Sequence, residues 1–129
     1  MKIILGSIFQ LQAELAGGKS GSIEFKGLLN EPVTFKTKYN LQKLLKKVNA
    51  EIEEYRKALV DLYKENGAEE QDGNLILKEG DPAIEKVNKE VMDLLSAEVN
   101  FEVSFSIDDF DFNSESTYPV FMDSAFAND

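Results

Sequence analysis

The sequence predicts an α+β domain: a long antiparallel helical hairpin with a small, mostly antiparallel β-sheet and an acidic, aromatic C-terminal arm. Apolar residues recur at helical spacing over about residues 38–66 and again over about residues 82–97, which predicts the two helices. Apolar and polar residues then alternate over residues 99–107, which predicts a strand with one buried face. At 129 residues the chain has the length of a single domain. We assign that domain to residues 1–107 and the arm to residues 108–129.

The first long helix is predicted from a seam of apolar residues that recur about every 3.5 residues, the spacing of a helix packed along one partner helix. Thr37 or Asn40 can cap its start, and Asn66 with Gly67 ends it. The seam consists of Leu41, Leu45, Val48, Ile52, Tyr55, Leu59 and Leu62.

The second helix begins at Asp81-Pro82, where an acidic capping residue is followed by proline at the first helical position. Since its apolar stripe has the same helical spacing, we expect the two stripes to face each other and to form core. The stripe consists of Ile84, Val87, Val91 and Leu94.

The strand at residues 99–107 loses its phase at Asp108-Asp109. Phe110 and Phe112 fall on even-numbered positions, whereas the apolar residues before them fall on odd-numbered ones. Because a slip of one residue moves side chains to the other face of a sheet, we expect the strand to bulge or end there. Earlier in the chain, Asp72-Gly73 signals a turn before a short strand at residues 75–77.

The segment before the hairpin is less regular. Residues 23–35 are predicted to form a weak β-hairpin around the turn GLLNEP, with Ile23 and Phe25 facing Val33 and Phe35. Residues 1–15 allow either a helix or a first strand at KIIL. The apolar positions of that helix would be Ile4, Ile8, Leu11 and Leu15.

Composition excludes several classes of enzyme. The chain has no histidine and no cysteine, so it has neither Ser-His-Asp nor Cys-His machinery and no thiolate metal site. The stretch GGKS ends like a phosphate-binding loop, but Ala13 stands where that motif needs its first glycine, so we interpret it as a flexible turn. We therefore expect no enzyme activity and no cofactor. We also expect no membrane association, because no apolar run is long enough to cross a bilayer.

The charge is distributed unevenly. Residues 1–89 carry 14 basic and 14 acidic residues, whereas residues 90–129 carry ten acidic residues and no basic one. The net charge of −10 therefore lies on the last part of the chain. Such a field repels nucleic acid and attracts basic partners, so we expect no direct DNA binding.

The C-terminal arm is the predicted partner-binding segment. Aromatic rings spaced among carboxylates suit an extended arm whose rings enter pockets while its acids meet Lys and Arg at the rim. The alternative is a tail folded back over its own core. The candidate residues are Asp108, Asp109, Phe110, Asp111, Phe112, Glu115, Tyr118 and Phe121.

The same segment resembles the opening of a calcium loop, with oxygen ligands at alternate positions from Asp109 to Glu115. That loop also needs glycine and glutamate at positions where this chain has Ser114 and Val120. We therefore expect no metal site.

A basic patch precedes the middle of the first helix. No acidic residue lies between Glu31 and Glu51. Three interpretations stay open: a solvated helix face, a phosphate or RNA site, or a surface that receives the acidic tail of the same chain or of a neighbouring copy. The patch consists of Lys36, Lys38, Lys43, Lys46 and Lys47.

One pattern spans about residues 38–107. It consists of Leu44, Glu51, Tyr55, Leu62 and Tyr63 with Gly67, then Asp72-Gly73, Leu94, Leu95, Glu98-Val99 and Val103. The pattern resembles a family of small, functionally uncharacterised proteins of tailed bacteriophages. The resemblance implies a phage or prophage origin, and hence a location in the host-cell cytoplasm or the virion.

The function expected from these observations is that of a non-enzymatic phage protein that contacts a phage or host protein, or neighbouring copies of itself. It would act in virion assembly or as an accessory factor. The alternative is an inhibitor that mimics DNA with a row of carboxylates and blocks a host nucleic-acid-binding enzyme. That row would consist of Glu90, Asp93, Glu98, Glu102, Asp108, Asp109 and Asp111. A carboxylate-based metal enzyme is disfavoured by the lack of histidine.

Overall fold

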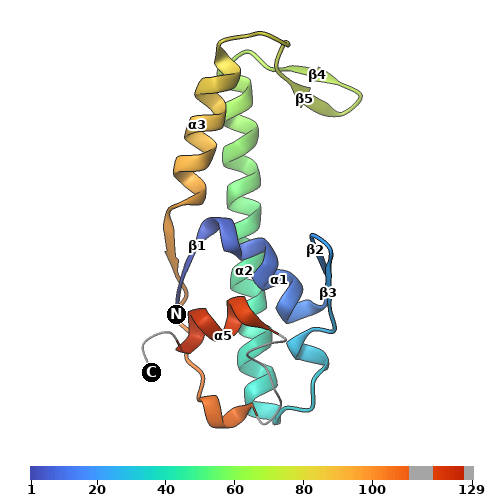
Figure 1. Ribbon diagram of the computed structural model, residues 1–129, viewed down its shortest axis with the longest axis vertical. Coiled ribbons are helices and arrows are strands. Elements are labelled where there is room, and N and C mark those ends of the chain that lie inside the picture. The colour runs from blue at the N-terminus through green and yellow to red at the C-terminus, as the bar shows by residue number, and fades with distance from the viewer. Residues whose placement is uncertain (111–117, 127–129) are drawn as a thin grey trace.

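A long helix, α2 (Phe35–Glu65), runs along the molecule, and the other elements pack against its two halves (Figure 1). The computed structural model describes residues 1–110 and 118–126. It confirms the α+β class. Within the described residues the strands form three separate antiparallel pairs rather than one sheet.

Helix α2 begins earlier than predicted because Thr34 caps it. The Thr34 hydroxyl oxygen accepts a hydrogen bond from the backbone N–H of Thr37 at 3.2 Å. Thr37 and Asn40, the two expected caps, lie inside the helix. The predicted end is confirmed: Asn66 follows the last helical residue, and its side-chain amide donates to the carbonyl of Leu62 at 2.8 Å.

The apolar seam of α2 is buried in the first half of the helix and only partly buried in the second. Leu41, Leu44, Val48 and Ile52 are buried, and Leu44 takes the core position that the strict seam assigned to Leu45. The reason is that this half packs against α1 (Ile8–Ala16) and other elements, so its buried stripe is wider than a contact with a single helix requires.

The second half of α2 forms the predicted helical hairpin with α3 (Ala83–Leu95), which runs antiparallel beside it (Figure 1). Asp81 caps α3, since its carboxylate accepts a hydrogen bond from the backbone N–H of Ala83 at 2.9 Å. Val87 is buried. Strands β4 (Glu69–Gln71) and β5 (Asn74–Ile76) form a hairpin between the two helices, which confirms the turn predicted at Asp72-Gly73.

The strand predicted over residues 99–107 is much shorter. Strand β6 (Glu98–Asn100) pairs with β1 (Lys2–Ile4), and the ladder ends where Met1 and Phe101 exchange backbone hydrogen bonds. Past Phe101, residues 101–106 pair with no strand in the described part of the chain. The apolar residues at odd-numbered positions are still buried or partly buried as far as Phe105. Ile107 is exposed and begins the 3₁₀ turn η3 (Ile107–Asp109).

The N-terminal segment forms both of its predicted alternatives in turn, strand β1 followed by 3₁₀ turn η1 (Leu5–Ser7) and helix α1. The hairpin predicted across residues 23–35 is wrong. Strand β3 (Ile23–Phe25) pairs instead with β2 (Gly18–Ser20), so the stretch GGKS is largely strand rather than a flexible turn. Gly21, at φ +63°, allows the tight turn between them, and residues 28–30 form 3₁₀ turn η2 (Leu28–Asn30).

The main core lies between α1, the first half of α2 and α5 (Pro119–Phe126). Phe110, Tyr118 and Phe121 belong to it. The expected boundary at residue 107 therefore does not mark the edge of the core.

Candidate functional site

Glu14 of α1 is a completely buried carboxylate that caps α5. It accepts hydrogen bonds from the backbone N–H groups of Val120 at 3.1 Å and Phe121 at 2.8 Å, and from the Gln10 side chain at 2.9 Å. These backbone groups lie in the first turn of a helix, where no earlier carbonyl can accept from them. Pro119, at the first helical position, has no N–H to satisfy. Glu14 thus fixes the place of the C-terminal helix on α1.

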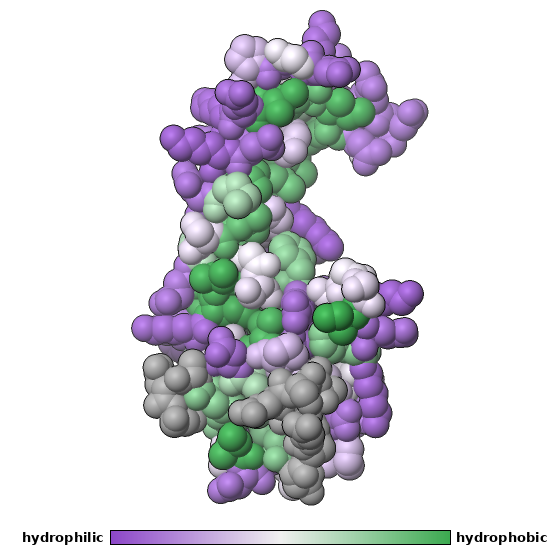
Figure 2. All heavy atoms as spheres, in the orientation of Figure 1, coloured by the Kyte–Doolittle hydropathy of each residue, from purple (hydrophilic) through white to green (hydrophobic). Residues whose placement is uncertain are grey.

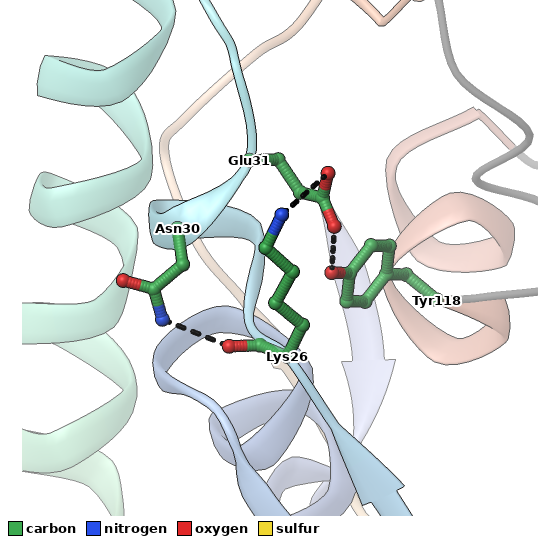
Figure 3. Close-up of polar contacts among 4 residues, drawn as sticks. All are labelled: Lys26, Asn30, Glu31 and Tyr118. Atoms are coloured by element: carbon green, nitrogen blue, oxygen red, sulfur yellow. Dashed lines mark hydrogen bonds and ion pairs between the residues drawn. The ribbon is translucent and has the colours of Figure 1, made fainter.

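Tyr118, just before α5, is joined to the loop after β3 (Figure 3). Its hydroxyl donates a hydrogen bond to Glu31 at 2.8 Å, and Glu31 also lies 3.7 Å from the Lys26 ammonium. Burial, and then the bond to Glu31 and its negative charge, raise the pKa of the Tyr118 phenol far above its usual range. The phenol therefore stays neutral and acts as a donor.

Glycine allows this loop to approach α1. Gly27 has φ +100°, and a Cβ there would lie only 2.6 Å from the backbone nitrogen of Gly17. The side-chain amide of Asn30 donates to the carbonyl of Lys26 at 2.8 Å (Figure 3), which holds the loop in this shape. In this loop Glu31 reaches the Tyr118 hydroxyl and the Lys26 ammonium reaches Glu31.

The aromatic residues of the predicted arm are core residues where the structure describes them. Phe110 and Phe121 pack edge to face with ring centroids 5.4 Å apart, and Phe126 packs against both. Phe110, Tyr118 and Phe121 are all buried, so the expectation that they are held out as contact anchors is corrected to the alternative, a tail folded over its own core.

The other candidates of the arm divide into two groups. Asp108 and Asp109 are exposed, and Asp109 accepts a hydrogen bond from the backbone N–H of Ser106 at 3.4 Å. Asp111, Phe112 and Glu115 lie outside the described residues. The calcium loop weighed for this stretch therefore falls mostly outside them as well. Within residues 1–110 and 118–126, no three His, Cys, Asp or Glu side chains are grouped so that they could hold a metal ion.

The predicted basic patch lies on α2 beside two exposed aromatic rings. Phe35 is 86% exposed and Tyr39 is 56% exposed. At about 100° per residue, Lys36, Lys43 and Lys46 fall on the side of these rings, opposite the buried stripe, and Lys38 and Lys47 fall at its two edges. Lys47 is counted with the rings because it lines the same hollow as Tyr39, Lys43 and Lys46. We call this surface the basic face of α2, formed by Phe35, Lys36, Tyr39, Lys43, Lys46 and Lys47.

The lysines of the basic face form no ion pair with any residue in the described part of the chain. Tyr39, Lys43, Lys46 and Lys47 surround a shallow hollow of about 590 Å³. Helix stability does not account for the lysine nearest the start of α2. The positive end of the helix dipole disfavours a cation in the first turn, and α2 has Lys36 and no acid there.

A second hollow, of about 1300 Å³, lies between β1 and α5. Ile4, Ile107 and Phe126 contribute apolar walls, and Lys2 and Glu98 lie 3.8 Å apart on its rim. A mixed wall of this kind suits a peptide or an apolar side chain, and its charges of opposite sign select no particular ligand.

The carboxylate row of the DNA-mimic alternative is exposed but mixed with cations. The side chains of Glu90, Asp93, Glu98, Glu102, Asp108 and Asp109 are exposed, and Asp111 lies outside the described residues. Lys86 and Lys89 share α3 with the first two acids, and Lys2 pairs with Glu98.

Sequence reasoning missed Glu14, Glu31 and Lys26. A signal existed for Glu14, since it lies next to Leu15 at helical spacing from Leu11, on a helix that must bury its apolar stripe. No local pattern marks Glu31 or Lys26, whose partner Tyr118 is far away in the sequence.

Comparison with known proteins assigns the chain to no family. The chain matches no family model, no curated protein and no solved structure. The resemblance to small proteins of tailed bacteriophages therefore stays a prediction. Of the helices that the structure describes, none combines the length and the apolar character needed to cross a membrane.

Proposed function

We propose that this chain is a non-enzymatic phage or prophage protein that acts by protein–protein contact, and that the basic face of α2 is its contact surface. It would work in the host-cell cytoplasm or the virion, in assembly or as an accessory factor. The observation that carries the proposal is the exposure of Phe35 and Tyr39 beside four lysines on one helix face.

The composition of this face is that of an interface. Aromatic side chains provide large contact areas at the centre of protein interfaces, and charged side chains surround them at the rim. The opposite side of the same helix is buried through Leu41, Leu44 and Val48, so the exposed rings are presented on a rigid element.

A protein partner is favoured over nucleic acid by the charge of the whole molecule. The net charge of −10 repels a phosphate backbone, and residues 90–129 contribute ten acids with no basic residue. The lysines of the basic face therefore suit a partner that offers a local cluster of carboxylates with an apolar group among them.

The test is affinity capture from nuclease-treated, phage-infected host lysate, comparing wild type with a Phe35→Ser/Tyr39→Ser variant by mass spectrometry. A matched control, Val60→Ser/Met92→Ser, removes two other exposed apolar side chains, one on α2 and one on α3. We expect the partner to be lost with the first variant and kept with the control. Equal recovery by all three baits would refute the assigned face.

A truncation at Ile107 is a poor bait for this purpose. It would remove Tyr118 and Phe121, which are completely buried, and so would unfold the core rather than delete an arm. Surface substitutions leave the core intact and separate binding from folding.

The DNA-mimic function stays as a second proposal because its described carboxylates are exposed. It requires a host nucleic-acid-binding enzyme that is released steeply by salt. Its test is a Glu90→Lys/Asp93→Lys variant, which should lose that enzyme, whereas Phe35→Ser/Tyr39→Ser should keep it.

A further inference from the structure

We infer that the basic face of α2 binds the acidic tip of a second copy of this chain, so that copies associate head to tail. The inference rests on the proposed function and names the partner. The acidic tip is defined here as the β4–β5 hairpin with its flanks, residues 64–81. Those residues hold six carboxylates and two lysines, a net charge of −4. The carboxylates are Glu65, Glu69, Glu70, Asp72, Glu79 and Asp81.

The two surfaces lie toward opposite ends of α2 (Figure 1). The helix has 31 residues, which at 1.5 Å per residue makes it about 46 Å long. Lys47, the last lysine of the basic face, precedes Glu65 by about 27 Å along the same rigid helix. A chain therefore cannot lay its own tip on its own basic face, and pairing these charges requires a second molecule.

The two surfaces also match in their apolar parts. On the tip, Ile76 of β5 is 45% exposed among the acids, and on the basic face Phe35 and Tyr39 are exposed among the lysines. Figure 2 shows hydrophilic residues around a smaller hydrophobic patch at the β4–β5 end of the molecule. An apolar centre with complementary charges at its rim is the usual composition of a specific contact.

The net charge of −10 does not forbid this contact. At physiological salt the Debye length is about 8 Å, so a compact contact at one end of the molecule senses mainly the charges beside it, whereas a nucleic acid that extends past the face meets the acids of the rest of the molecule. Along this stretch of α2 the nearby charges are the lysines, since no acid lies between Glu31 and Glu51 in the sequence.

The contact joins two different surfaces, so a bound pair keeps one unused face on one copy and one unused tip on the other. Such heterologous contacts propagate into open chains or close into rings. The expected behaviour of the wild-type protein is a series of assemblies that grows with concentration.

The experiment uses full-length chains in sedimentation velocity from about 10 μM to about 1 mM at physiological salt. One variant reverses the face, Lys43→Glu/Lys47→Glu, and another reverses the tip, Glu69→Lys/Glu70→Lys. We expect each alone to raise the apparent Kd about tenfold or more. Their equimolar mixture should associate again into chains that alternate the two variants, because the intact tip of one meets the intact face of the other and the reversed face meets the reversed tip.

Two further variants complete the design. A chain with all four substitutions carries an acidic face and a basic tip, and should regain association with itself. A control, Lys86→Glu/Lys89→Glu, makes the same change of charge on α3 and should associate like wild type. Far-UV circular dichroism of every variant verifies that the helices are intact.

Several outcomes overturn the inference. A wild-type protein that stays monomeric at about 1 mM rules out the second copy, and so does a tip variant that associates as well as wild type. A mixture of the two variants that stays monomeric has the same consequence. In each case a partner lost on Phe35→Ser/Tyr39→Ser in the capture experiment would leave the proposed function standing with a different occupant.

Discussion

The two halves of α2 are covered to very different depths. Around its first half, α1, α5 and the segment after β6 form a core in which Leu41, Leu44 and Phe121 are completely buried. Around its second half the described elements that pack are mainly α3 and the β4–β5 hairpin, and Val87 is buried there while Leu94 is 39% exposed. Stability is therefore concentrated around the first half of α2, and the second half with α3 is a two-helix projection suited to presenting a surface.

Shortening one core side chain in each half of α2 should produce the largest difference in stability. Phe121→Ala, within the aromatic cluster, should lower the free energy of unfolding by about 3–5 kcal/mol. Leu62→Ala, where the side chain is only half-buried, should lower it by about 1 kcal/mol, because less apolar area is lost. Urea denaturation measures both, and comparable losses would contradict the difference between the halves.

Glu14 tests whether its carboxylate holds the C-terminal helix in place. Glu14→Ala leaves the backbone N–H groups of Val120 and Phe121 without their acceptor, and should cost about 1–3 kcal/mol. Glu14→Gln keeps one acceptor oxygen and should cost less.

Amide hydrogen exchange locates the effect of these Glu14 variants. Relative to wild type, we expect the variants to accelerate exchange at Val120 and Phe121 more than in the second half of α2. The reason is that the turn that has lost its cap opens first. An acceleration spread evenly over the chain would argue against a local cap.

Tyr118 gives the first half a dependence on alkaline pH. Because its folded-state pKa lies above the unfolded value of about 10, its contribution is complete below pH 10 and is lost as pH rises further. Tyr118→Phe removes the bond to Glu31 and should cost about 0.5–1.5 kcal/mol at neutral pH. The midpoint temperature of thermal unfolding of the wild type should fall above about pH 10, and it should fall less steeply in the variant.

The smallest expected effect concerns the start of α2. Lys36→Glu places a negative charge near the positive end of the helix dipole and should stabilise the protein by about 0.3–1 kcal/mol. A gain in stability with a loss of association would separate the role of this lysine in binding from its role in folding. Destabilisation would mean that Lys36 is needed by the fold.

Elements with local signals follow directly from the order of the residues. The seam from Leu41 to Ile52 predicts a long helix, Asp81 predicts the start of the next one, and Asp72-Gly73 predicts the turn of the hairpin between them. The structure contains all three, and each signal depends on residues only a few positions apart. The grouping of the lysines of the basic face can also be predicted from the sequence, since their positions around the helix follow from their spacing.

The partners of those elements depend on contacts between residues far apart in the sequence. The alternation after Val99 predicts a long strand. A strand extends only as far as its partner, however, and the ladder ends at the Met1–Phe101 pair. The alternation around Phe35 predicts a strand, whereas the Thr34 cap starts α2 there. Phe110, Tyr118 and Phe121 of the described tail are core, and Glu14, distant in sequence, accepts a hydrogen bond from the start of α5, a contact that no local pattern encodes.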